Sequence, residues 1–510
     1  MNTAAVPVGP GTDQQSIPST TSTGGEAYKY AETTRLLCAA AWLDSGFRNT
    51  VLKWYHEDNR HRATAPNFGV DMATVVRQCA RARSALNSRE AWLLIPVVLA
   101  LLALAAAPVP GLVLVYLVGF AICLVYTSRA RSVATKHFMR GKFNPDALLS
   151  QDQTTSVSLR EAEAGNCLVY SGFTPFVGSG ENIGGWSFAL DLRKRADGSG
   201  GLPARDSSQT VVVMNGQPGE RISLADLYDR INRDIGDLHL DRVFIDDKLY
   251  INGRDIRTDQ RFLGDPLACP RNRVTPEVMQ QAMLEQTEQK LRHYRCIRVV
   301  DWNGEQVLSI FLRFSRLSHN LFVEASYFLL TPVGDRFRKI DSLDSRMTFR
   351  RACETTLRAA VAAPFLTVWA PFALLQRVME ILQASSRRGH EEKLILDDPS
   401  FDYGAALSCR QWASPNLYRR YFQKLDKEMY FKVLEKNVLD SILTFLEENN
   451  VDVSELKQRQ ATILNNGVIV SGGSMTTENL AVGEGAKVDN LKQKVTNIAA
   501  RSATTGKRAS

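Results

Sequence analysis

The stretch Ala91–Ser128, AWLLIPVVLALLALAAAPVPGLVLVYLVGFAICLVYTS, contains no charged side chain and decides how this chain is organised. As one straight helix it would be about 57 Å long, nearly twice the ~30 Å hydrocarbon core of a bilayer. At its middle, Pro108 and Pro110 break a helix and Gly111 permits a tight turn. The stretch therefore predicts a two-helix transmembrane hairpin over 91–128 that turns at these three residues.

Basic residues flank this stretch on both sides. The preceding ones are Arg77, Arg81, Arg83 and Arg89, and the following ones are Arg129, Arg131, Lys136, Arg140 and Lys142. Because basic flanks stay on the cytoplasmic side, a hairpin in the cell membrane with both termini cytoplasmic fits better than a single span. Two buried helices of a soluble protein are a third alternative. We expect the five following residues to contact anionic lipid headgroups, which fits this position better than nucleic acid does.

The chain before the hairpin divides into two parts. Residues 1–26 are rich in Ser, Thr, Pro and Gly and have no apolar run, which is typical of a disordered leader. Residues 27–90 place apolar side chains at steps of three and four, which predicts a helical domain.

Residues 129–345 predict a cytoplasmic α+β domain. Asn303-Gly304 stands between two apolar runs, a strong signal for a β-hairpin, and 320–333 adds a third strand to an antiparallel meander. Ser223 is expected to cap a helix that starts at Leu224. Asp246-Asp247 is interpreted as the turn of a second hairpin.

Residues 346–390 contain a second uncharged stretch, 359–376, which includes Pro364 and Pro371. It is too short for two spans, and one simple crossing would move the charged C-terminal third outside. A re-entrant or interfacial segment and a buried core helix are the alternatives.

The C-terminal part predicts a helical region over 391–461, with a long helix from 415 to 448 capped by Ser414. The apolar stripe of this helix is explained by core packing or by self-association. Residues 462–491 are rich in Gly, Asn and Val and predict a short β motif. A basic disordered tail is predicted over 492–510.

One glycine-rich segment is a candidate ligand or partner loop. Its residues are Gly178, Gly180, Glu181, Gly184, Gly185 and Trp186. Ile183 fills the third glycine position of a dinucleotide fingerprint and a strand follows instead of a helix, so that fingerprint is rejected. The eight cysteines form no CxxC unit, and no catalytic, metal or cofactor motif is found. Cys296 and His319 could act together only if the fold brought them close.

The stretches 426–488, 170–192 and 27–90 resemble uncharacterised bacterial membrane-anchored proteins with a Gly/Asn-rich C-terminal β tail. The resemblance implies no catalytic residues. With a net charge of +8, 44% apolar and 23% charged residues, the chain has ample soluble mass beside its anchor. We expect a membrane-anchored scaffold or regulatory protein that binds a protein partner or self-associates. A membrane-perturbing effector of a bacterial conflict or stress response, and an enzyme with a site near 173–186, are the alternatives.

Overall fold

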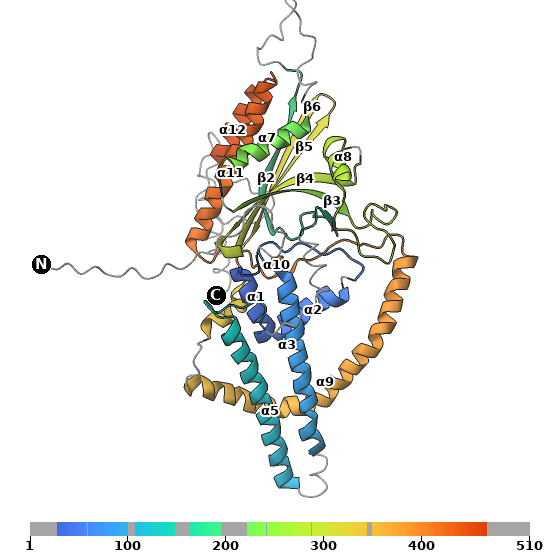
Figure 1. The fold of residues 1–510 in the computed structure, drawn as a ribbon, viewed down its shortest axis with the longest axis vertical. Coiled ribbons are helices and arrows are strands. Elements are labelled where there is room, and N and C mark those ends of the chain that lie inside the picture. The colour runs from blue at the N-terminus through green and yellow to red at the C-terminus, as the bar shows by residue number, and fades with distance from the viewer. Residues whose placement is uncertain are drawn as a thin grey trace, which may run out of the picture. The chain divides into compact units, whose positions relative to one another are not determined.

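The computed structural model describes residues 28–58, 60–99, 108–147, 164–194, 222–240, 242–286, 288–343 and 349–466 (Figure 1). Helices accompany one six-stranded mixed sheet, so the α+β class is confirmed. The sheet order is β1-β3-β4-β5-β6-β2. The strands are β1 Cys167–Tyr170, β2 Glu181–Asp191, β3 Val243–Asn252, β4 Leu291–Asp301, β5 Gln306–Leu317 and β6 Asn320–Leu330.

Strands β4, β5 and β6 are neighbours in the sheet in chain order, as a meander requires. At the connection between β4 and β5, Asn303 and Gly304 have φ values of 54° and 83°. Trp302 is also left-handed, with a φ of 50°, and the connection runs from Trp302 to Glu305. The predicted hairpin is therefore confirmed, with a turn longer than the two-residue Asn-Gly turn. Strand β3 lies between β4 and β1 in the sheet, and it pairs antiparallel with β4 and parallel with β1.

The described chain divides into two compact units, each built from three separate segments. The first comprises Met1–Glu181, Leu240–Ser309 and Leu329–Leu425. The second comprises Asn182–His239, Ile310–Phe328 and Asp426–Ser510.

A buried helical core lies in the first unit. Its helices are α1 Glu32–Leu43, α2 Ser45–Leu52, η2 Lys53–Asp58, α3 Met72–Trp92, α5 Pro108–His137, η4 Asp335–Ser342 and α10 Cys409–Trp412. Leu36 and Leu37 of α1 are fully buried beside Val75 of α3 and Phe138, which follows α5. We call this cluster the helical core. It continues to Phe337 of η4, whose ring meets that of Phe47 at a centroid distance of 5.1 Å.

The same unit contains the 49-residue helix α9, Phe349–Asp397, with Pro364 and Pro371 inside it. Figure 1 shows α9 bent, and prolines inside a helix are a recognised cause of bending. Two short helices, η3 Trp302–Gly304 and α8 Pro276–Leu284, complete the unit.

In the second unit, helices α7 Leu224–Gly236 and α12 Ser454–Asn466 accompany most of α11 Tyr421–Glu448. The Ser223 hydroxyl accepts a hydrogen bond from the amide of Asp226, so the predicted cap of α7 is confirmed. Tyr228 of α7 packs edge-on against Phe314 of β5, with centroids 4.9 Å apart.

Two local predictions were wrong. Asp246 and Asp247 lie inside the continuous strand β3, because Arg298 and Arg295 on β4 pair with their carboxylates across the strands. The long helix starts at Tyr421 rather than at residue 415, since α10 and a short connection occupy the preceding residues. The predicted leader over 1–26, the basic tail and nearly all of the Gly/Asn-rich motif over 462–491 lie outside the described residues.

Candidate functional site

One buried arginine ties together the end of α5 and the segment that leads into α9. Arg35 of α1 is 2% exposed. Its Nη1 donates a hydrogen bond of 2.8 Å to the carbonyl oxygen of Phe138, just after α5. Its Nη2 lies 2.7 Å from the carboxylates of Glu32 and Asp341, the latter in η4. The exit of the first apolar stretch and the approach to the second are therefore held by the same side chain.

The far end of α9 is held by the same unit. Arg257, which follows β3, donates hydrogen bonds to the carbonyl oxygens of Ile395 (2.6 Å), Leu396 (2.9 Å) and Asp398 (2.6 Å). A guanidinium at these last carbonyls satisfies groups that have no partner inside the helix. Both ends of α9 thus return to one compact unit.

Helices α5 and α9 pack against each other through small residues. Ala359, Ala363 and Ala370 of α9 are buried with Cys123 of α5. A Cβ atom on Gly119 would lie only 2.6 Å from Oγ1 of Thr367, so the two backbones approach closely at this point. Spacings of four between small residues allow such close packing and are typical of helix contacts inside membranes.

Pro364 leaves a carbonyl oxygen of α9 without its helical donor, because proline has no N–H to offer the residue four positions earlier. That residue is Ala360. The hydroxyl group of Tyr116 on α5 lies 3.4 Å from its carbonyl oxygen. The neighbouring helix therefore supplies the donor that the proline removes.

The outer faces of the two helices are apolar and exposed, and we call α5 and α9 together the apolar arm. The exposed side chains include Val113, Leu114, Leu117, Val125, Val361, Phe365, Val368, Trp369, Phe372 and Leu375. Two segments, Val113–His137 and Ala352–Gln376, are long and apolar enough to cross a membrane. Within the apolar 18-residue window of each segment, only 11% and 22% of the residues are buried.

The structure places the predicted membrane-facing residues as follows. Pro108, Pro110 and Gly111 begin helix α5 instead of forming a turn between helices, since proline is well tolerated at the first positions of a helix. Residues 100–107, immediately before them, lie outside the described chain. Of the predicted headgroup residues, Arg129, Lys136, Arg140 and Lys142 are exposed and Arg131 is half-buried.

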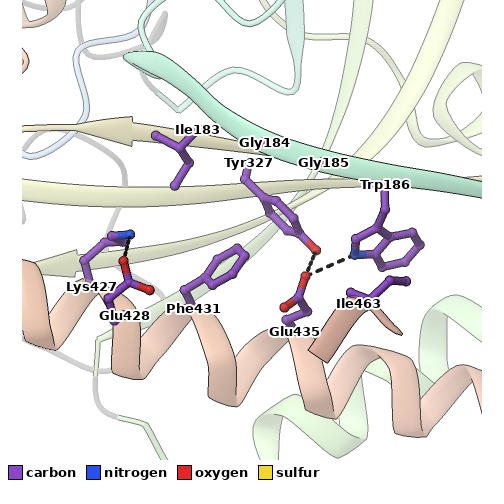
Figure 2. A pocket seen from close by; sticks show the side chains of 10 residues that line it. All are labelled: Ile183, Gly184, Gly185, Trp186, Tyr327, Lys427, Glu428, Phe431, Glu435 and Ile463. Carbon is purple, nitrogen blue, oxygen red and sulfur yellow. Dashed lines mark hydrogen bonds and ion pairs between the residues drawn. The ribbon is translucent and has the colours of Figure 1, made fainter. Parts of the chain in front are cut away.

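A pocket in the second unit lies between the strands β2 and β6 and the helices α11 and α12 (Figure 2). Its empty volume of about 480 Å³ includes space open to solvent. The lining residues are Ile183, Gly184, Gly185, Trp186, Tyr327, Lys427, Glu428, Phe431, Glu435 and Ile463. Glu435 is 6% exposed, and its Oε1 accepts hydrogen bonds from the Tyr327 hydroxyl (2.8 Å) and from Nε1 of Trp186 (3.3 Å).

The carboxyl group of Glu435 ionises less readily in this pocket than it does in water. Burial raises the pKa of its carboxyl group, and the hydrogen bonds from Tyr327 and Trp186 offset this only in part. Burial also raises the pKa of the Tyr327 hydroxyl well above its usual range, with the Glu435 carboxylate as the next cause. The three groups therefore form a polar cluster inside a largely aromatic and aliphatic wall.

The predicted glycine-rich loop is divided between different roles. Gly184, Gly185 and Trp186 lie in strand β2 and line this pocket, whereas Glu181 is exposed at the start of the strand. Gly178 and Gly180 belong to the first unit and have φ values of 90° and 96°.

Close packing explains why Gly178 and Gly180 are glycines. A Cβ on Gly178 would lie 2.3 Å from the carbonyl oxygen of Pro66, and one on Gly180 would lie 2.1 Å from that of Leu329. No residue other than glycine fits at either position, because any Cβ atom would collide with these carbonyl oxygens.

Sequence reasoning missed Tyr327, Phe431 and Glu435. A signal was present, because Glu435 lies four residues after Phe431 and four before the buried Leu439, on an apolar face of its helix. The suggested pair of Cys296 and His319 gains no support, since burial raises the pKa of the Cys296 thiol to about 12 and keeps it protonated at neutral pH. Among the described residues, no group of three or more His, Cys, Asp or Glu could hold a metal ion.

Fold and site together define an α+β protein with a mixed sheet and two helices that are apolar and long enough to cross a membrane. A family model described as the AbeC-like domain matches residues 185–476. This match covers more than half of the 510 residues, so the chain belongs to the AbeC-like family. Searches of curated proteins and of solved structures gave no match.

Proposed function

We propose that this chain is a membrane-anchored scaffold or regulatory protein. In this proposal the segment 91–128 crosses the cell membrane twice, both termini stay in the cytoplasm, and the sheet-containing parts bind a protein partner or a second copy. The observation that carries it is the apolar arm, whose outer side chains lie exposed although the same unit has a well-packed core. Exposed apolar surfaces of this extent mark contact with lipid or another protein.

The hairpin arrangement is supported by where its two ends lie. The first part of α3 packs in the helical core through Val75, Val76 and Cys79, and the last turns of α5 pack in the same core through Ala134 and Phe138. A segment whose two ends return to one core enters and leaves the bilayer on the same side. The uncharged part of α5, residues 108–128, is about 31 Å long, which matches the hydrocarbon thickness.

The same reasoning applies to α9. Arg35 holds the segment before it and Arg257 holds its end, so α9 also enters and leaves on one side, as a re-entrant or interfacial helix does. The bond from Tyr116 to Ala360 supports this, because no water is available in lipid to satisfy a free carbonyl group. Since most of its outer side chains are exposed, α9 does not have the burial of a core helix.

Partner binding is supported by α11. The side chains of Phe422, Leu425, Met429 and Val433 are exposed at successive turns of this helix. On another face of the same helix, Leu434, Val438 and Ile442 are buried. Core packing therefore accounts for one apolar face of α11, and the exposed stripe is left for another molecule.

Cysteine labelling in intact cells tests the proposed topology. We suggest replacing the exposed Cys269 and Cys353 by serine and then introducing Phe173→Cys or Gly111→Cys separately. A membrane-impermeant maleimide should label position 111 from outside and position 173 only after the membrane is permeabilised. Labelling of position 173 in intact cells contradicts the cytoplasmic placement, and protection of position 111 contradicts two full crossings.

A further inference from the structure

Glu435 is buried, and no cation of the described residues lies beside its carboxylate. Among the described residues, its contacts within hydrogen-bonding distance are the neutral donors Tyr327 and Trp186, both at Oε1. Its second oxygen, Oε2, accepts no bond from the described residues (Figure 2). Since buried carboxylates are normally paired or metal-bound, this group has unused capacity to bind a positive charge.

The other charged residues that line the pocket do not neutralise the Glu435 carboxylate. The ammonium group of Lys427 forms an ion pair with Glu428, the next residue on α11. These two charges cancel, so the ionised Glu435 leaves the pocket with one negative charge in excess. An anionic ligand is therefore disfavoured, and a cation is favoured.

The walls of the pocket suit an organic cation better than a metal ion. Trp186, Tyr327 and Phe431 bring three aromatic rings to the site, and aromatic faces attract ammonium and guanidinium groups. The Lys427 ammonium already lies 5.9 Å from the centre of the Phe431 ring, so one cation of this chain uses such a face. Ile183 and Ile463 add aliphatic surface for the stem of a long side chain.

We propose that this pocket binds a lysine or arginine side chain of a protein partner, with its charged head at Glu435 and its aliphatic stem between the isoleucines and the aromatic rings. This assignment rests on the proposed partner-binding function. Charge complementarity argues for the basic side chain. The exposed stripe of α11 argues for a protein as its carrier, since the same helix contributes four residues to the pocket.

Ligand-observed NMR on the full chain in detergent micelles tests this site. The probes are acetyl-arginine methylamide, acetyl-lysine methylamide and the uncharged acetyl-norleucine methylamide, which has a similar stem. We expect saturable binding of the two basic probes and at least tenfold weaker binding of the norleucine probe. Glu435→Gln should weaken the basic probes at least tenfold, because its amide oxygen still accepts both hydrogen bonds but the charge is gone.

Glu447→Gln is the matched control, because it removes one negative charge from an exposed site on the same helix that is paired with Lys457. It should leave all affinities unchanged. Equal binding of the norleucine probe, or unchanged binding to Glu435→Gln, overturns the proposal. Butylammonium binding at least tenfold more tightly than the blocked amino acids would assign the pocket to a free amine and overturn the partner assignment. None of these outcomes alters the labelling of positions 111 and 173, so this proposal and the anchor fail separately.

Discussion

Helix α5 has apolar side chains near both of its ends, and those side chains lie in opposite surroundings. Near its C-terminal end, Ala134 is fully buried in the helical core, and so is Phe138 just beyond it. Near its start, Val113 and Leu117 are 55% and 52% exposed, and on the neighbouring α9 Phe365 is 74% exposed. One continuous helix thus leaves a packed protein interior and becomes an apolar surface.

This difference shows that apolar composition alone does not say what surrounds a helix. In the helical core, neighbouring side chains exclude water and apolar burial stabilises the fold. Among the described residues of the apolar arm, one side of each helix is covered at the crossing, where Leu93, Phe120 and Leu366 pack with the small residues. The proposal assigns the remaining surface to lipid, and the following predictions test the contrast between helical core and apolar arm.

The largest expected effect comes from Arg35→Leu, at the base of the apolar arm. It removes the donor of the Phe138 carbonyl and the buried partner of Asp341, which should cost about 3–5 kcal/mol. The buried thiols of Cys38 and Cys79 report on opening of the helical core. Their labelling by N-ethylmaleimide in detergent should become at least ~100-fold faster.

Arg140→Leu is the control for this variant. Arg140 also pairs with Glu32, at 2.9 Å, but its side chain is 58% exposed. Its loss should cost less than about 1 kcal/mol. Similar labelling rates in the two variants would show that Arg35 does not secure the base of the apolar arm.

A leucine truncation in each region should give unequal results. Leu37→Ala in the helical core should cost about 2–5 kcal/mol, because it leaves a cavity among fully buried side chains. Leu117→Ala in the apolar arm should change stability in detergent by less than about 0.5 kcal/mol. The same cysteine labelling measures both variants, and an equal loss for Leu117→Ala means that protein covers that face.

An intermediate effect is expected at the crossing of α5 and α9. Gly119→Val places a side chain against Thr367 and should cost about 1–3 kcal/mol of packing. Spin labels at Leu117 and Phe365 would follow the distance between the helices while sodium dodecyl sulfate is added. The two helices of the Gly119→Val variant should separate at a lower concentration of sodium dodecyl sulfate than those of the parent chain.

The effect at the crossing must depend on the residue opposite. Gly119→Ala alone also places a Cβ atom against the hydroxyl oxygen of Thr367. Adding Thr367→Ala removes that oxygen, so the double variant should recover most of the docking that Gly119→Ala alone loses. If Gly119→Val docks like the parent chain, the close approach of the two helices is wrong.

A smaller effect than at the contact of Gly119 with Thr367 is expected for Tyr116→Phe. Loss of the hydroxyl group leaves the Ala360 carbonyl without a donor and should cost about 1 kcal/mol in the same detergent titration. In a Pro364→Ala background the cost should disappear, because the new backbone N–H can reach that carbonyl within α9. An equal cost in both backgrounds would mean that Tyr116 does not compensate for the proline.

Local rules predicted the features that depend on neighbouring residues. Asn303-Gly304 and the Ser223 cap follow from the conformational and hydrogen-bonding preferences of two or three residues. For Asp246-Asp247 the local preference for a turn gives the wrong answer. The arginine partners of these two residues lie 52 and 48 residues away, where no local pattern reveals them. Long-range pairing therefore overrode turn preference in β3.

The same limit applies to the candidate sites. The glycine-rich stretch led to Gly184, Gly185 and Trp186, but Glu435 lies 249 residues from Trp186. The Arg35 contact joins positions 103 and 306 residues apart, so the common base of the two apolar helices was not visible in the sequence. Composition revealed the apolar stretches, and only the fold showed that their ends meet.

Electron paramagnetic resonance of spin labels in lipid vesicles tests the central claim, that the apolar arm lies in the bilayer. Labels replace Leu117 on α5, Phe365 on α9 and, as a control, Phe173, an exposed aromatic residue (98%) that belongs to neither helix of the apolar arm. The account predicts that oxygen relaxes the labels at 117 and 365 more strongly than a water-soluble nickel chelate does, with the reverse at 173. Strong relaxation by the nickel chelate at both 117 and 365 would contradict the membrane anchor.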